Sequence, residues 1–191
     1  MQIDAAGFLD TARFIASPNC DERPAGTEIS LLVIHNISLP PNEFGGNGVI
    51  ELFTNQIDSD AHPYYQSLQG LEVSSHFFIR RDGSIIQFVL CNLRAWHAGV
   101  SYWQGKDKCN DFSIGIELEG SDTTLFTDQQ YSVLIGLTKC LCERYPITDI
   151  AGHSDIAPDR KTDPGPHFDW QKYANNLDNN LIKRQKSNTP E

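Results

Sequence analysis

No hydrophobic run in this sequence is long enough to cross a membrane. A membrane-spanning helix needs about 18 or more consecutive apolar residues, and the 191 residues contain no such stretch. The segment 1–24 carries acidic side chains, and it lacks the basic start and the continuous apolar core of a secretory signal. From these two absences we expect no membrane contact and a cytoplasmic protein.

Positive charge is also scarce. Lysine and arginine total 15 against 25 aspartates and glutamates, which gives a formal net charge of -10. A chain this acidic is poorly suited to hold nucleic acid or an anionic membrane by its overall charge. A local basic cleft can still bind a small anionic molecule. We therefore expect a small-molecule substrate and no nucleic acid partner.

The cysteines do not form a recognisable pattern. The sequence has five, which is an odd number, and none of them forms a CxxC motif. In a chain without an export signal, such a set favours free buried thiols in a reducing cytosol over disulfides. The Gly-rich phosphate loop and the nucleophile elbow of serine hydrolases are missing as well, so neither of those sites is predicted.

The periodicity of apolar residues predicts one α/β domain with a central mixed β-sheet flanked by helices. Strands are expected at 30–37, 75–80, 84–90, 112–119 and 149–152, and helices at 49–55, 128–144 and about 168–183. Asp82-Gly83 favours a hairpin between the second and third strands, and Thr127 with Gln130 forms a capping box. The expected division is an irregular segment at 1–28 packed on the domain, the domain itself at 29–183, and a solvated tail at 184–191.

Two histidines and one aspartate lie where α/β proteins place functional groups. His35 is near the end of the apolar strand 30–37, and His153 directly follows the strand 149–152. Asp163 lies in a loop that two neighbouring prolines stiffen. Each has an ordinary alternative, as a core histidine or a turn carboxylate. Together they would form a site with an open fourth position, as catalytic zinc requires, although iron or manganese accepts the same ligands.

Two further residues could serve proton chemistry near such a metal. Glu117 alternates with apolar residues in the strand 112–119, beside Gly115, which leaves room for a ligand or a close backbone. The residue could be a general base, or it could lie on a solvated face of the sheet. Lys161 is two residues before Asp163, so in an extended segment both side chains point the same way, where the ammonium could stabilise an oxyanion.

Aromatic side chains gather in the segment 93–105, LRAWHAGVSYWQG. Trp96, His97, Tyr102 and Trp103 all occur there, in a segment that also contains Gly99 and Gly105. Aromatic residues in such a loop can stack on sugar rings or form the wall of a cleft. They can equally pack into the core, and the sequence favours neither alternative.

Six blocks of the sequence resemble, in order, the zinc N-acetylmuramoyl-L-alanine amidases of the amidase-2 type. The blocks are LVIHNISLPPNEFGG (32–46), DAHPYY (60–65), SSHFFIRRDG (74–83), RAWHAGVS (94–101), CNDFSIGIELEG (109–120) and GHSDIAPDRKTDPGP (152–166). They cover most of residues 30–170, and six ordered blocks are more specific than a single metal motif. The fold implied by the resemblance is that of the amidase-2 and peptidoglycan recognition proteins.

The resemblance also implies a site and a reaction. It puts the zinc ligands on His35, His153 and Asp163, the catalytic glutamate on Glu117 and the catalytic lysine on Lys161. One Zn²⁺ per chain would assist hydrolysis of the amide between the lactyl group of (1,6-anhydro-)N-acetylmuramic acid and L-alanine of a small muropeptide. Such enzymes, acting as monomers in the cytoplasm, recycle peptidoglycan, and in some bacteria they restrain β-lactamase induction.

The substrate contacts that the resemblance implies are fewer. Asn36, Trp96 and Lys108 would contact the sugar or the peptide. Glu72 departs from the family's pattern, because a basic residue that binds the peptide carboxylate is expected there. Two alternatives remain: a non-catalytic module that binds peptidoglycan fragments, and an amidase that acts on the polymeric cell wall. All five metal and catalytic positions are filled, which favours an enzyme, and the missing signal favours a fragment as its substrate.

Overall fold

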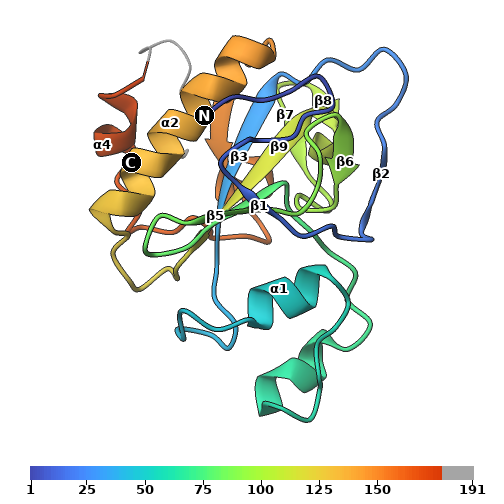
Figure 1. The fold of residues 1–191 in the computed structure, drawn as a ribbon, viewed down its shortest axis with the longest axis vertical. Helices are drawn as coiled ribbons and strands as arrows, with labels where there is room; N and C mark the ends of the chain where they lie inside the picture. Colours follow the sequence, from blue (N-terminus) through green and yellow to red (C-terminus); the bar gives the residue numbers. More distant parts are fainter. Residues whose placement is uncertain (178–191) are drawn as a thin grey trace.

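A six-stranded mixed sheet forms the centre of residues 1–177, the part of the chain that this computed structural model describes (Figure 1). The strands, in spatial order, are β1 (Arg13–Phe14), β5 (Ile85–Gln87), β4 (Phe77–Ile79), β9 (Ser113–Glu119), β3 (Leu31–Ile37) and β10 (Asp149–Gly152). Strands β4 and β5 are antiparallel, and the other neighbours are parallel. The α/β class and the central mixed sheet predicted from the sequence are confirmed.

One face of the sheet is covered by the long helix α2 (Asp128–Arg144) (Figure 1). The predicted capping box is present: the hydroxyl of Thr127 accepts a hydrogen bond from the Gln130 amide, and the Gln130 side chain accepts one from the Thr127 amide. The residues that pack at this face are the even-numbered members of β3 and β9 together with the inner side of α2, namely Leu32, Ile34, Ile114, Ile116, Leu118, Leu134, Leu137 and Leu141. Burying this apolar surface stabilises the sheet on that side.

The odd-numbered residues of β3 and β9 therefore point to the opposite face. Part of that face is covered by α1 (Gly48–Phe53) and the 3-10 helix η1 (Pro63–Leu68), which form the lower part of Figure 1. Phe53 of α1 meets Phe88 edge-on with ring centroids 5.1 Å apart, within a second apolar cluster that also contains Phe78 of β4. A third cluster packs on β3 and β10 beyond it. His35 of β3 and Glu117 of β9, both odd-numbered, also point to this face and are buried.

The hairpin predicted around Asp82-Gly83 is confirmed. Strands β4 and β5 pair antiparallel, and Gly83 has a φ of +84°, a conformation that glycine adopts without strain. Both strands are shorter than the predicted ranges 75–80 and 84–90. The observed helix α1 lies close to the predicted 49–55, and β10 has the predicted bounds 149–152.

Several short elements were not predicted. They are β2 (Cys20–Glu22) with β6 (Leu93–Ala95), β7 (Tyr102–Trp103) with β8 (Lys106–Asp107), η2 (Cys109–Asp111) and α3 (His153–Ile156). Two of the strands, β1 and β2, lie in the segment 1–28 that was expected to be irregular. Elements of two to four residues have too little periodicity to be detected, because their neighbours in space determine them.

The last predicted helix, at about 168–183, is wrong at residues 168–169 and 175–177. Within the described residues the structure has α4 (Trp170–Ala174), followed by a turn at 175–177, where Asn175 and Asn176 are poor helix formers. The predicted residues 178–183 and the tail 184–191 lie outside the described residues. No helix within residues 1–177 is both long and apolar enough to cross a membrane.

Candidate metal centre and active site

The parallel pairing of three strands brings the predicted site together. Strands β9, β3 and β10 are neighbours with a common direction, so their carboxyl ends meet at one edge of the sheet. In this register His35 of β3 is paired with Glu117 of β9. His153 directly follows β10, whose last residue is paired with Ile34. Residues far apart in the sequence thus become neighbours through the order of the strands.

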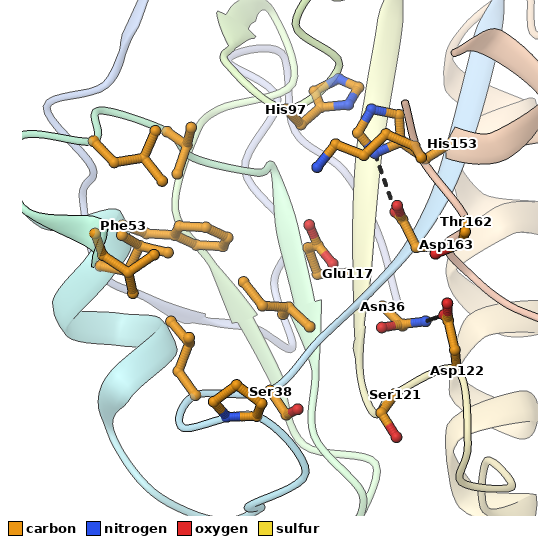
Figure 2. Close-up of a pocket in the computed structure, with 18 of the residues that line it drawn as sticks. Asn36, Ser38, Phe53, His97, Glu117, Ser121, Asp122, His153, Thr162 and Asp163 are labelled. Carbon is orange, nitrogen blue, oxygen red and sulfur yellow. Dashed lines mark hydrogen bonds and ion pairs between the residues drawn. The ribbon is translucent and has the colours of Figure 1, made fainter. Parts of the chain in front are cut away.

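Three donor atoms converge at this edge. The Nδ1 atoms of His35 and His153 lie 2.9 Å apart, and each is 3.1 Å from Oδ2 of Asp163. Figure 2 shows His153 and Asp163 facing each other at one end of a cavity. Both imidazoles are buried, with exposed fractions of 1% for His35 and 3% for His153. Atoms with these separations can each reach a zinc ion at the usual bond length of about 2.0–2.2 Å.

The protonation of the two rings fits a cation at this point. His153 Nε2 lies 3.1 Å from the carbonyl oxygen of Ala98, which can only accept, so the ring proton is on Nε2 and the Nδ1 lone pair faces the cluster. Burial, together with neighbouring His153, lowers the pKa of His35 to about 4, so this ring is neutral. Burial alone would raise the pKa of Asp163, but its close approach to His153 and His35 outweighs burial and lowers that pKa, so the carboxylate is ionised. Two imidazoles and one carboxylate are ligands that zinc accepts.

Glu117 lies beside the three donor atoms without joining them. Its Oε1 is 3.9 Å from Nδ1 of His35, and its Oε2 is buried with no hydrogen-bond partner among the described residues. The residue is 8% exposed, so the alternative of a solvated sheet face is wrong. Burial raises the pKa of Glu117 well above its ordinary value, the charge of Asp163 adds to this, and Lys161 opposes it. A carboxyl with a raised pKa next to a metal is suited to proton transfer.

A cavity of about 460 Å³ opens in front of these groups. Glu117, Lys161, His153 and Asp163 line it at one end, and Figure 2 shows Phe53 of α1 at the other side. Its remaining lining comes mainly from the loops after β3 and α1 and from the segment 121–122. The half-buried Lys161 thus shares the cavity with Asp163, as the two-residue spacing predicted.

The predicted substrate contacts fall into two groups. Asn36 and Trp96 line the cavity, and Asn36 donates a hydrogen bond of 2.8 Å to Oδ1 of Asp122, which sequence reasoning had not selected (Figure 2). Lys108 is exposed and is not among the residues that line the cavity. Glu72 is also exposed, and it lines a separate hollow of about 250 Å³ behind the loop 69–72. The structure therefore brings Asn36 and Trp96 to the candidate site and leaves Lys108 and Glu72 outside it.

Sequence reasoning did not predict that His97 contacts a candidate metal ligand. This residue was grouped with the aromatic segment 93–105, but its ring is buried beside the metal cluster, with Nδ1 3.0 Å from Nε2 of His35. A Cβ atom on Gly115 would lie 2.5 Å from Cγ of His97. The space that Gly115 leaves is thus filled by this ring. In the same segment Trp103 packs into the core. Trp96 and His97 instead line the cavity, so core packing applies to one of these aromatic residues and a cleft wall to the others.

The chain is similar in sequence to a family of known proteins. A family model described as N-acetylmuramoyl-L-alanine amidase matches residues 25–166. A curated relative from Enterobacter cloacae, the 1,6-anhydro-N-acetylmuramyl-L-alanine amidase AmpD, is 57% identical over 169 residues, which cover 87% of this chain and 90% of the relative.

Solved structures agree with the sequence comparison. The crystal structure of a selenomethionine AmpD derivative matches with a TM-score of 0.91 at 54% identity and covers 93% of this chain and 100% of that one. The Escherichia coli amidase AmiD, in complex with the substrate anhydro-N-acetylmuramic acid-L-Ala-D-gamma-Glu-L-Lys, matches with a TM-score of 0.58 at 32% identity. That match covers 91% of this chain and 65% of AmiD.

Proposed function

Since this chain belongs to the N-acetylmuramoyl-L-alanine amidase family, we propose that it hydrolyses the amide between 1,6-anhydro-N-acetylmuramic acid and L-alanine, with one zinc ion per chain. The supporting observation is the convergence of His35, His153 and Asp163 beside a buried carboxyl, at the end of a cavity. The similarity of this chain to AmpD, which covers 87% of the chain, supports a role in peptidoglycan recycling.

We assign the metal ligands to Nδ1 of His35, Nδ1 of His153 and Oδ2 of Asp163. A zinc ion held there supplies Lewis acidity, which polarises a carbonyl group and makes a water molecule easier to deprotonate. The ligands come from two strand ends and one proline-stiffened loop. Their positions are therefore fixed by the sheet and by a loop with little freedom, and little ordering is needed when the metal binds.

Glu117 serves as the general base in this proposal. Its raised pKa favours taking a proton from the attacking water, and the same proton can then pass to the nitrogen of the departing L-alanine. Because Oε2 has no partner among the described residues, it is available to accept that proton. The step conserves atoms: water adds its hydroxyl to the lactyl carbonyl carbon, and the amine leaves with the proton that Glu117 carried.

Lys161 stabilises the negative charge that develops on the carbonyl oxygen. Lys161 lines the cavity together with Glu117 and Asp163. A fixed positive charge in a partly buried site typically contributes a factor of about 100 to 1,000 to such a step. Asn36 and Trp96, which line the same cavity, would orient the sugar and the first part of the peptide.

The chain's setting is also part of the proposal. We infer that the chain acts on small fragments, because a cavity of about 460 Å³ suits one muropeptide, and we also propose that it acts as a monomer. All five cysteines are free, and Cys91, Cys109 and Cys140 are buried. Free thiols fit a reducing cytoplasm.

The test is incubation of the purified chain with an anhydro-muropeptide, followed by mass analysis of the products. We expect free stem peptide and anhydro-muramic acid, loss of both products after chelation, and recovery when zinc is restored. If the muropeptide binds but stays intact with zinc present, the protein is a non-catalytic binding module. Release from polymeric peptidoglycan at an equal rate would instead make it a cell-wall amidase.

A further inference from the structure

We propose that Ser113 and His97 act as positioning residues that fix the proton of His35 on Nε2 and so keep its Nδ1 free for the metal. This inference rests on the proposed zinc site, and it concerns what holds that site ready before zinc arrives. Ser113 does not touch the cluster of His35, His153 and Asp163. It acts through His97, which neither the sequence motifs nor the proposed reaction assign a role.

The three side chains form a continuous line of contacts behind the cluster. Nε2 of His35 is 3.0 Å from Nδ1 of His97. Nε2 of His97 is 3.1 Å from the hydroxyl of Ser113, and that hydroxyl is 2.6 Å from the carbonyl oxygen of Cys109. All three side chains are buried, with exposed fractions of 1%, 9% and 0%. His97 also lines the cavity, but the small exposed fractions leave water little access to this line of contacts.

The carbonyl of Cys109 sets the direction of every hydrogen bond in the line. A carbonyl oxygen can only accept, so at 2.6 Å the hydroxyl proton of Ser113 must point to it. The oxygen of Ser113 is then left to accept from His97, which puts the His97 proton on Nε2. Nδ1 of a neutral His97 is consequently an acceptor, and the proton of His35 must lie on Nε2 to be donated to it.

The surroundings of His97 hold its backbone in place and restrict the space around its ring. Its backbone amide donates to Oδ1 of Asn110, 3.1 Å away, and the amide of Ala98 donates to the same atom at 2.8 Å. The ring lies over Gly115, where any larger residue would overlap it. Its hydrogen-bond partners are His35 and Ser113, neither of them a carboxylate that would hold a second proton. A His97 ring with one proton, on Nε2, and in this orientation therefore satisfies both hydrogen bonds.

In the second histidine ligand, His153, a single hydrogen bond fixes the ring proton on Nε2. His153 donates from Nε2 directly to the carbonyl of Ala98, the residue that follows His97. Arg160 donates to the same carbonyl oxygen at 2.7 Å and so holds it in place. The hydrogen bonds that begin at each histidine ligand thus lead to a backbone carbonyl of the segment 97–109: that of Cys109 for His35 and that of Ala98 for His153. Partners of this second layer typically change metal affinity or activity by about 10- to 100-fold when removed.

The first test reads the protons directly, in the wild-type chain. Long-range ¹H–¹⁵N spectra of the full-length protein, freed of zinc, report which ring nitrogen of each histidine carries hydrogen. We expect the Nε2-protonated form for both His35 and His97 before and after zinc is added. Hydrogen on Nδ1 of either ring in the zinc-free chain would overturn the proposal, because zinc itself would then be setting the tautomer.

The second test measures zinc affinity by competition with a chelator of known affinity. We expect Ser113→Ala to weaken binding by about 10- to 100-fold. Ser75→Ala is the matched control: Ser75 is equally buried and donates to the carbonyl of Gly115 at 2.8 Å, without contact to either ring. Equal affinities of the Ser113→Ala variant and the wild type would overturn the proposal.

His97 offers a rescue that a purely structural role would not show. His97→Phe keeps a ring and removes the acceptor, whereas His97→Asn keeps an acceptor near the position of Nδ1. We expect the His97→Asn variant to bind zinc more tightly than the His97→Phe variant, and the reverse order would contradict the account. A wild-type chain that binds no zinc would overturn the proposed function instead, while its nitrogen spectra would still decide where the protons lie.

Discussion

The two ends of the cavity differ in how firmly their side chains are held. At the metal end, His35 and His153 are 1% and 3% exposed, and each ring nitrogen has a defined neighbour. At the loop end, which comprises residues 38–42 and 64–73, Tyr64 is 42% exposed and Leu71 is 46% exposed. The metal end is built on strand ends and one proline-stiffened loop, and the loop end on longer connections between elements (Figure 2).

This difference separates chemistry from recognition. Groups on strands hold their geometry without the substrate, so the metal end is preorganised for the reaction. Loops adjust more easily and vary more, so the loop end is suited to selecting the sugar and the peptide. Substitutions at the metal end should therefore abolish zinc binding or turnover, whereas substitutions near the loop end should change the apparent affinity for the substrate.

The largest effect is expected from Asp163→Ala. Removing the carboxylate leaves two imidazoles, so zinc affinity should fall by more than the roughly 100-fold that an outer-layer change can cause, and turnover should fall below detection. Zinc content after gel filtration and the rate of stem-peptide release measure the two effects. Asp159→Ala, an exposed aspartate of the same loop, is the control and should keep both. Zinc retained by Asp163→Ala would remove this residue from the ligand set.

Glu117→Gln should separate catalysis from metal binding. The amide keeps the shape of the side chain but cannot accept the proton of water, so turnover should fall by about 10²- to 10⁴-fold. Zinc content should remain one ion per chain, because Glu117 is not among the three converging donors. Loss of zinc would make Glu117 a ligand, and normal turnover would exclude it from the mechanism.

Lys161→Met should lower kcat by about 100- to 1,000-fold with little change in zinc content. Methionine keeps much of the length and apolar stem of lysine while removing the charge that stabilises the oxyanion. Lys139→Met, on the exposed side of α2, is the matched control for a lost positive charge. A change in KM alone would show that Lys161 binds substrate without serving the transition state.

The buried carboxyl at the metal end should also cost stability. Because burial raises the folded-state pKa of Glu117 above about 4.5, the zinc-free chain should lose stability as the pH rises from that value through the raised pKa. Glu117→Gln avoids this loss and should be more stable at pH 7 by about 0.5–2 kcal/mol. Urea unfolding of the zinc-free chains should show the gap close below about pH 4, and a gap that widens in acid would contradict the sign.

Trp96→Ala should have the smallest effect. Trp96 is half-buried and lines the cavity, and it is not one of the three residues with converging donor atoms. Loss of an aromatic contact worth about 0.5–1.5 kcal/mol corresponds to an increase in KM of roughly two- to twelvefold. Steady-state kinetics on the anhydro-muropeptide would measure it, and a fall in kcat at constant KM would place Trp96 with the chemistry instead.

The same comparison explains what the sequence revealed. Strand periodicity located β3, β9 and β10, and the polar residues at their ends, His35 and His153, followed from it. The pairing that puts His35 opposite Glu117 depends on the order of strands in space, which periodicity does not contain. His97 was missed as a partner of His35 because the two are joined only through the folded sheet, and the small residue at Gly115 was the one local sign of its ring.

Recognition was harder to predict because it depends on loops. Asn36 and Trp96 do line the cavity, but the partner of Asn36 is Asp122, in a turn after β9 that has no motif. Lys108 was expected to contact substrate and lies outside the lining residues. Glu72, whose charge was unexpected, faces a different hollow. Loop residues are placed by tertiary contacts, so their spacing along the chain says little about which surface they reach.

The central claim is a zinc ion held by His35, His153 and Asp163, and anomalous diffraction tests it most directly. Crystals of the zinc-loaded chain, measured on both sides of the zinc absorption edge, should show one peak of anomalous density within about 2.0–2.2 Å of the two Nδ1 atoms and Oδ2. No peak at this point, or a peak bound by other residues, would contradict the account.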